Sequence, residues 1–141
     1  MHEPVLTAEE IEAFLRQEFP QMYLDGDIFH ITGISRGTAQ MRLDTIERQL
    51  RPGGTVSGPT LFTLADVSAY VVALAHVGAK ALVLTTNLNI NFLRRAEPGS
   101  LTCNARILKL GRRLVVVDLE IADKGSALVA QATATYSIPE R

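Results

Sequence analysis

The chain has 141 residues, of which 47% are hydrophobic and 21% are charged, and its formal net charge at pH 7 is −1. This length and balance predict one folded domain with a buried core, residues 1–141, and exclude an extensively disordered chain. The near-neutral charge and the lack of a block of basic residues argue against a nucleic-acid partner.

Two features of the sequence indicate a cellular compartment. Cys103 is the single cysteine, which excludes an internal disulfide and a cysteine-based zinc cage and fits a reducing environment. The segment Met1–Pro4 lacks the basic and then apolar pattern of a signal peptide. We therefore expect a cytoplasmic protein.

An N-terminal helix is predicted just after Thr7. Thr7 and Glu10 have the spacing of a capping box, in which the two side chains satisfy free N–H groups reciprocally. The apolar residues that follow at helical spacing are Ile11, Phe14, Leu15 and Phe19. The helix should end at Pro20, and we expect residues 1–24 to form a helical extension that covers one side of the fold.

Two strands are predicted next, Ile28–Ser35 and Thr38–Ile46, with a turn near Gly37. In the second strand, apolar residues alternate with polar ones, as in a half-buried strand. The apolar set is Ala39, Met41 and Leu43, and the polar set is Gln40, Arg42 and Asp44.

The loop Arg51–Gly58 is rich in turn-forming residues. It could be a plain connection. A loop that leads into a helix also presents free backbone N–H groups, so it could instead bind an anion or a carbonyl oxygen.

A long apolar helix is predicted from Gly58 to His76. Pro59 suits its first turn, and apolar residues occur on all sides, so we expect the helix to be covered all round. Its length approaches that of a membrane span, but the other apolar runs are short and strand-like, which favours a buried core helix and no membrane partner. His76 lies near the C-terminus of the helix, where a partly charged imidazole suits the helix dipole, and we expect it to be structural.

Asp66 is the unusual residue of this helix. It lies too far from the helix start to be a cap, and an ionised carboxylate among apolar residues costs free energy unless a partner satisfies it. A lone aspartate in a helix is commonly a satisfied or exposed residue, and the alternative is a catalytic carboxylate. We interpret Asp66 as the candidate active-site residue.

Four strands are predicted after the helix. Their apolar faces are Leu82, Leu84, Leu88, Ile90 and Phe92; Leu101, Cys103, Ala105 and Ile107; Val115, Val117, Leu119 and Ile121; and Leu128, Ala130, Ala132, Ala134 and Tyr136. In the first strand, the opposite face holds Thr85, Asn87, Asn89 and Asn91. Short connections at Pro98-Gly99, Gly111-Arg112 and Lys124-Gly125 should make successive strands antiparallel neighbours. The pattern predicts an α+β domain in which a curved antiparallel sheet covers one long helix.

Two motifs add a family resemblance. The first is Ser57-Gly58-Pro59-Thr60-Leu61-Phe62-Thr63-Leu64-Ala65-Asp66, and the second is Asn89-Ile90-Asn91-Phe92-Leu93-Arg94-Arg95-Ala96-Glu97-Pro98-Gly99. In this order, with the strands behind them, they resemble the PaaI-like acyl-CoA thioesterases, named for the thioesterase of phenylacetate degradation. The resemblance implies a hotdog fold over residues 25–141, in which a curved antiparallel sheet wraps around the long central helix, with an extra N-terminal helix.

The resemblance also implies site residues. The family's catalytic carboxylate maps onto Asp66, its carbonyl-polarising glycine N–H onto Gly58, and a hydroxyl seen in some members onto Thr85, which could also be an ordinary sheet residue. The residues expected to contact the substrate are Ser57, Pro59, Asn89, Arg94, Arg95 and Arg112. These arginines and Arg113 could bind the phosphates of coenzyme A bidentately, although surface arginines often only solvate a face.

Three positions depart from the family pattern. Ser57 stands where the family usually has His, Pro59 where it has a second Gly, and Arg51 where many members have Asn or Gln. These changes bear on rate and substrate and leave the fold intact. We expect no metal site and no cofactor beyond the coenzyme A of the substrate, and His2 and His30 have no identifiable partner.

Thioester hydrolysis needs a base or nucleophile and a donor for the developing oxyanion, the roles expected for Asp66 and the Gly58 N–H. The two residues are eight positions apart. That is about 12 Å along a helix, too far for one thioester to touch both in one chain. We therefore expect a homodimer with antiparallel helices and two equivalent interface sites. The family resemblance implies that such dimers often pair into tetramers.

Three functional hypotheses follow. The leading one is an acyl-CoA thioesterase whose acyl group the sequence does not identify. The alternative is a non-catalytic acyl-CoA-binding protein, because of the departures at Ser57, Pro59 and Arg51. A hotdog dehydratase acting on 3-hydroxyacyl thioesters is disfavoured, because no histidine stands beside Asp66 as the paired Asp and His of such relatives do.

Overall fold

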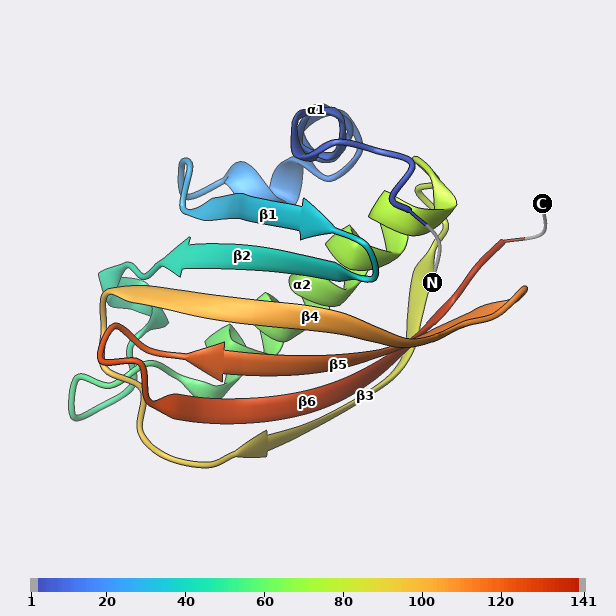
Figure 1. The fold of residues 1–141 in the computed structure, drawn as a ribbon. Helices are drawn as coiled ribbons and strands as arrows, with labels where there is room; N and C mark the ends of the chain where they lie inside the picture. Colours follow the sequence, from blue (N-terminus) through green and yellow to red (C-terminus); the bar gives the residue numbers. More distant parts are fainter. Residues whose placement is uncertain (1–2, 140–141) are drawn as a thin grey trace.

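A six-stranded sheet and one long helix dominate the computed structural model, which describes residues 3–139 (Figure 1). The helices are α1 (Ala8–Glu18) and α2 (Gly58–Val77), with the 3₁₀ helices η1 (Pro20–Tyr23) and η2 (Glu47–Gln49). The strands are β1 (Phe29–Ser35), β2 (Thr38–Asp44), β3 (Leu84–Phe92), β4 (Ser100–Leu110), β5 (Leu114–Ala122) and β6 (Leu128–Ser137). The antiparallel sheet curves around α2, and α1 lies at the β1 edge, which confirms the predicted hotdog architecture (Figure 1).

The order of strands in the sheet is β1-β2-β4-β5-β6-β3. Successive strands are neighbours for β4–β5 and β5–β6, but the prediction is wrong for β3 and β4. β3 pairs with β6 at the sheet edge, and β4 pairs with β2. The segment 93–99 is longer than a hairpin turn and crosses past the start of α2, where the Val56 N–H donates to the Ala96 carbonyl at 3.0 Å.

The core lies between α2 and the inner face of the sheet. The predicted inward residues of β4, β5 and β6 are buried, except Leu128 at the start of β6. By length and composition α2 could cross a membrane, but 78% of its most apolar 18-residue window is buried inside the protein. This confirms the interpretation of α2 as a core helix.

One face of α2 is nevertheless open. Pro59, Phe62 and Thr63 are exposed and Asp66 is half-buried, at the spacing of a single helix face. The expectation of a helix covered all round is therefore wrong for one chain. The sheet ends at β3, so no further strand within residues 3–139 covers this face.

The N-terminal extension is capped and packed as predicted. The Thr7 hydroxyl accepts from the Glu10 N–H at 3.1 Å, and the Glu10 carboxylate accepts from the Thr7 N–H at 2.9 Å. α1 ends at Glu18, and η1 begins at Pro20. Ile11 and Leu15 are fully buried, which holds this extension against the core.

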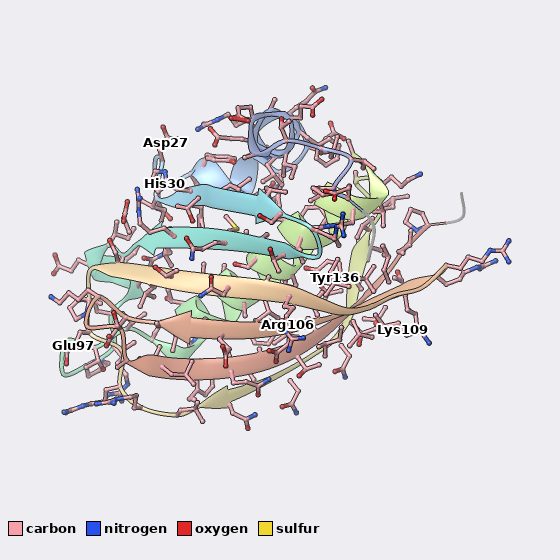
Figure 2. All side chains as sticks on the ribbon, viewed as in Figure 1. Asp27, His30, Glu97, Arg106, Lys109 and Tyr136 are labelled. Carbon is pink, nitrogen blue, oxygen red and sulfur yellow. The ribbon has the colours of Figure 1, made fainter. Side chains whose placement is uncertain are left out.

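The outer face of the sheet is polar. Arg106 lies there and pairs with Asp118 at 3.8 Å, whereas Tyr136 is buried on the inner face (Figure 2). The sheet therefore has one wetted face and one face that packs on α2, as an antiparallel sheet commonly does.

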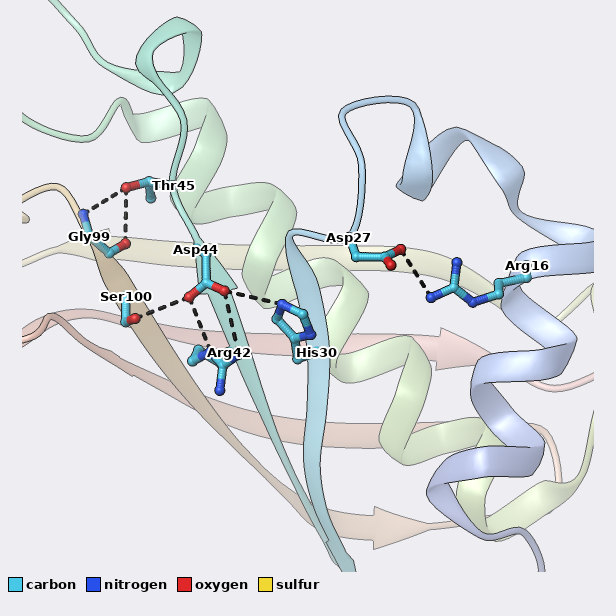
Figure 3. Close-up of polar contacts among 8 residues, drawn as sticks. All are labelled: Arg16, Asp27, His30, Arg42, Asp44, Thr45, Gly99 and Ser100. Carbon is cyan, nitrogen blue, oxygen red and sulfur yellow. Dashed lines mark hydrogen bonds and ion pairs between the residues drawn. The ribbon is translucent and has the colours of Figure 1, made fainter.

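His30 has a partner on this outer face, contrary to expectation. Its Nε2 lies 3.1 Å from Asp44 Oδ2, because antiparallel pairing sets His30 opposite Arg42 and diagonal to Asp44 (Figure 3). Burial acts to raise the pKa of Asp44, but hydrogen bonds from Arg42 and Ser100 outweigh it and hold this pKa below its usual value. His2 lies outside the described residues.

Candidate active site

Two hydroxyl groups hold the Asp66 carboxylate. Thr85 Oγ1 donates to Asp66 Oδ1 at 2.7 Å, and the Tyr136 hydroxyl lies 2.6 Å from the same oxygen. The Tyr136 hydroxyl is also 2.8 Å from the Asp66 carbonyl, but its one proton favours the charged acceptor. Within residues 3–139 no donor is bonded to Oδ2, so the carboxylate is fixed through one oxygen and the other is available.

A bulge in β3 turns Thr85 toward Asp66. Thr85 lies opposite Tyr136 and Asn87 lies opposite Thr135, so Thr86 is an extra residue in β3. The alternation of faces reverses at this point. The prediction that Thr85 shares a face with Asn87, Asn89 and Asn91 is therefore wrong, and this correction is what brings its hydroxyl to the carboxylate.

Tyr136 is a site residue that the sequence did not reveal. Periodicity placed it on the apolar face of β6 without indicating a polar role. Burial first, and then the neighbouring Asp66 carboxylate, raise the pKa of Tyr136, so its hydroxyl remains a proton donor. One feature of the sequence could have indicated this role. On the inner face of this strand, a single residue with a hydroxyl group, Tyr136, follows three alanines, Ala130, Ala132 and Ala134.

A cavity of about 450 Å³ opens beside Asp66. Its apolar and aromatic walls are formed by Phe19, Phe62, Val67, Tyr70, Val83 and Leu84. Thr63, Ala81, Thr85 and Tyr136 complete the lining, and no cationic side chain contributes to it. The cavity suits an uncharged, apolar group next to a carboxylate.

Gly58 lies in a second cavity, of about 380 Å³, together with Arg51, Arg94 and Arg95. Among residues 3–139 no acceptor binds the Gly58 N–H, whereas the Ser57 N–H donates to the Gln49 carbonyl at 2.9 Å. A Cβ atom at Gly58 would lie 3.3 Å from Phe92 Cζ, so a side chain here would press on that ring. A free N–H at a helix start, near three arginines, suits an oxyanion or a phosphate.

The other predicted contact residues are dispersed. Ser57 caps α2, with its hydroxyl 2.8 Å from the Thr60 hydroxyl, and it lines a third cavity with Pro59. Asn89 is exposed on the edge strand opposite Thr133.

Arg112 lies in the β4–β5 turn, at the end of the sheet where Leu84 and Leu114 both pair with Ser137. Arg94 and Arg95 follow the other end of β3. One chain therefore does not bring Arg112 together with these two arginines.

His76 is structural, as predicted, but in its neutral form. Its Nε2 accepts from the Gly37 N–H at 2.8 Å, and Nδ1 lies 2.9 Å from the Val72 carbonyl, to which it donates. This pattern requires one protonated nitrogen and one free nitrogen, so the expected partial charge is wrong. No group of three or more His, Cys, Asp or Glu residues that could hold a metal ion occurs in residues 3–139.

The geometry thus separates the two groups of the candidate reaction centre. One cavity contains a fixed carboxylate, and a different cavity contains a free backbone donor. A sheet curved around a helix that bears both groups is the architecture of a hotdog-fold thioester hydrolase.

The sequence comparison agrees with this class. The family model described as the thioesterase superfamily matches residues 53–130, and the chain belongs to this superfamily.

Similar proteins have been described by structure and by sequence. A proposed thioesterase of Silicibacter sp. TM1040 is 47% identical, with 97% of this chain and 94% of that chain covered and a TM-score of 0.86. A proposed thioesterase of Ralstonia eutropha JMP134, described as phenylacetic acid degradation-related, is 31% identical, with coverage of 78% and 84% and a TM-score of 0.74. A proposed esterase of Saccharolobus solfataricus is 30% identical over 140 residues, 96% of this chain and 87% of that protein. The predicted resemblance to PaaI-like thioesterases is confirmed, and the chain is a thioester hydrolase.

Proposed function

We propose that the protein is an acyl-CoA thioesterase in which Asp66 performs the chemistry. The observation that carries this proposal is the carboxylate itself, held at Oδ1 by Thr85 and Tyr136 and unbonded at Oδ2 beside an apolar cavity. A carboxylate fixed in this way is oriented for reaction at its second oxygen.

The reaction can proceed with Asp66 as a general base. Oδ2 takes a proton from water as the water oxygen bonds to the thioester carbon, and the carbonyl oxygen becomes an oxyanion. The Gly58 N–H, at the positive end of α2, stabilises this oxyanion. The C–S bond then breaks, the oxyanion returns to a carbonyl, and the thiolate leaves with a proton from Asp66. Direct attack of Asp66 on the thioester carbon is the alternative use of the same oxygen, with water hydrolysing the resulting anhydride.

A second copy of the chain supplies the missing half of each site in this proposal. β3 is an edge strand with apolar side chains in solvent: Leu84 is 53% exposed and Phe92 54%, and Leu93, the residue after the strand, is 53% exposed. Such an edge needs cover, and antiparallel pairing of two β3 strands provides it. This pairing sets the Thr85 end of one strand against the Phe92 end of the other. Asp66 of one copy then faces Gly58 of the second copy.

The same pairing gathers the predicted phosphate ligands. Arg112 lies toward the Thr85 end of the sheet, and Arg94 and Arg95 follow Phe92. Dispersed in one chain, they meet across the two-fold axis, where guanidinium groups can bind the phosphates of coenzyme A.

Substitution of Asp66 tests this function. We expect Asp66→Asn to lower kcat for acyl-CoA hydrolysis by about 10²–10⁴-fold, because an amide cannot take the proton or attack. The assay is thiol release from short, medium, long and aromatic acyl-CoAs. Asp27→Asn is the matched control, since Asp27 pairs with Arg16 on the surface and lines none of the cavities described above. Hydrolysis by Asp66→Asn at the wild-type rate contradicts the proposal.

A non-catalytic acyl-CoA-binding protein is the second candidate. It is favoured by Pro59, which has no N–H to donate beside Gly58, and by Ser57, whose hydroxyl is engaged with Thr60. Saturable binding of acyl-CoA by calorimetry, without turnover on any substrate, is its expected signature. Measurable turnover excludes it.

A further inference from the structure

The cavity beside Asp66 adjoins another cavity, and one aromatic side chain lines both. The Asp66 cavity, about 450 Å³, and the cavity next to Ser57, about 420 Å³, share Phe19, Thr63 and Val67. Thr63 and Val67 belong to α2, which forms a common floor. Phe19 comes from the N-terminal extension and lines both cavities, so its ring lies where the two meet.

The surrounding structure holds Phe19 in place. It is the C-cap of α1, where its N–H donates to the Leu15 carbonyl at 2.7 Å, and Pro20 follows it at the start of η1. Its ring packs edge-on against Tyr70, with centroids 6.3 Å apart and planes at 72°.

An aromatic series connects Phe19 to the carboxylate. Tyr70 stacks on Tyr136 with centroids 6.0 Å apart, and the Tyr136 hydroxyl contacts Asp66. The Tyr70 hydroxyl donates to the Ala81 carbonyl at 3.3 Å, which fixes the other side of the cavity. Phe19, Tyr70 and Tyr136 therefore form one continuous aromatic wall, which begins at Phe19 and ends at the hydroxyl that orients Asp66.

The two cavities differ in character. The walls on the Asp66 side are apolar and aromatic, with Asp66 as their charged residue. Beyond Phe19, the lining includes Gln21, Asp25, Arg48 and Gln49. An apolar chain gains free energy on the first side and meets polar groups on the second.

We propose that Phe19 is the stop that sets the length of the acyl chain this enzyme accepts. This inference rests on the proposed function, because the acyl chain is the part of the substrate that suits the apolar cavity. The phosphate end of coenzyme A requires cations, and no lysine or arginine lines this cavity. With the thioester carbon at Asp66, the chain extends along α2 toward Phe19. Each methylene buried before the stop raises kcat/KM about fourfold, and chains too long for this space lower it because they press on the ring.

Phe19→Ala tests the stop. In wild type, kcat/KM for straight-chain acyl-CoAs should rise with chain length to an optimum and then fall. Removing the ring frees the volume that it occupies beside Tyr70, Thr63 and Val67, so about two more methylenes can be buried there without reaching the polar lining beyond, and the optimum should move to longer chains. A substrate two carbons beyond the wild-type optimum should gain at least about tenfold relative to the wild-type optimum substrate. Phe19→Leu should give a smaller shift, and it serves as the second variant where Phe19→Ala folds poorly.

Two other phenylalanines provide matched controls. Phe14, in α1, packs on the core and lines neither cavity, so Phe14→Ala should keep the wild-type chain-length profile. Phe29 lines the cavity beyond Phe19 and does not line the Asp66 cavity. Phe29→Ala should also keep the wild-type chain-length profile, because the Phe19 ring is still present.

The outcomes separate this inference from the proposed function. If Asp66→Asn abolishes turnover and Phe19→Ala lowers kcat/KM equally for all chain lengths, the thioesterase stands and the stop is wrong. If wild type hydrolyses no acyl-CoA, the proposed function is wrong, and calorimetric affinities of the same acyl-CoAs decide the stop. A longer preferred chain in Phe19→Ala supports it, and an unchanged preference overturns it.

Discussion

The separation of Asp66 and Gly58 predicts that two defective chains can restore one working site. Asp66→Asn removes the carboxylate and leaves the Gly58 N–H intact. Gly58→Val keeps the carboxylate and disturbs the donor, since a Cβ atom at this position already lies 3.3 Å from Phe92 Cζ and a valine side chain must shift the ring or the backbone that carries the N–H, besides crowding the space in front of it. A dimer made of one chain of each kind has one site with both groups intact and one site with neither.

The expected magnitude follows from this arrangement. Eight residues of helix separate the two groups by about 12 Å, so in the proposed dimer each working site combines two chains. Loss of an oxyanion donor lowers rates by about 10²–10³-fold, so each variant alone should be nearly inactive. The mixed dimer should have about half the wild-type activity, about fiftyfold or more above either parent.

Co-expression of the two variants with different affinity tags allows the mixed dimer to be purified and assayed for thiol release. Size-exclusion chromatography and thermal unfolding of each variant establish that it is folded and dimeric. Gly33→Val is the matched control, because a Cβ atom at Gly33 meets no atom within 4 Å. If the mixed dimer is no more active than its parents, the site does not combine two chains and the reasoning from spacing is refuted.

Two further predictions concern buried hydroxyl and thiol groups. Tyr136→Phe keeps the ring and removes the hydroxyl donor that lies 2.6 Å from Asp66 Oδ1. We expect kcat to fall about tenfold, because the carboxylate loses one of the two hydrogen bonds that orient it. An unchanged kcat means that this contact does not orient the carboxylate. Burial raises the pKa of the Cys103 thiol to about 12, so alkylation at pH 8 should be at least roughly a thousandfold slower in the native than in the denatured protein. Mass spectrometry measures the extent of alkylation over time. Equal alkylation rates in the native and the denatured protein contradict the burial of Cys103.

Local patterns in the sequence were sufficient for much of the fold. The Thr7–Glu10 box and Pro20 indicate the limits of α1, and Pro59 indicates the start of α2. These signals work because caps and prolines act through neighbouring backbone groups. Asp66 was recognisable because an acidic residue inside an apolar helix is costly wherever the helix packs.

Other features depend on contacts between distant segments. The bulge at Thr86 reverses the face of Thr85, and nothing in strict alternation indicates it, because its position is set by the pairing of β3 with β6. The placement of β3 at the sheet edge follows from the path of residues 93–99 past Val56.

The contact of Tyr136 with Asp66, and the position of Phe19 on which its proposed role rests, were found only through the three-dimensional structure. The local sequence pattern predicts a core position for both residues, because Tyr136 ends the apolar face of a strand and Phe19 ends the apolar face of an amphipathic helix. Tyr136 meets Asp66 from 70 positions along the chain, and Phe19 meets Tyr70 through the docking of the N-terminal extension. Periodicity reports which side of an element is buried, whereas the identity of the group it meets depends on how elements far apart in the chain pack together.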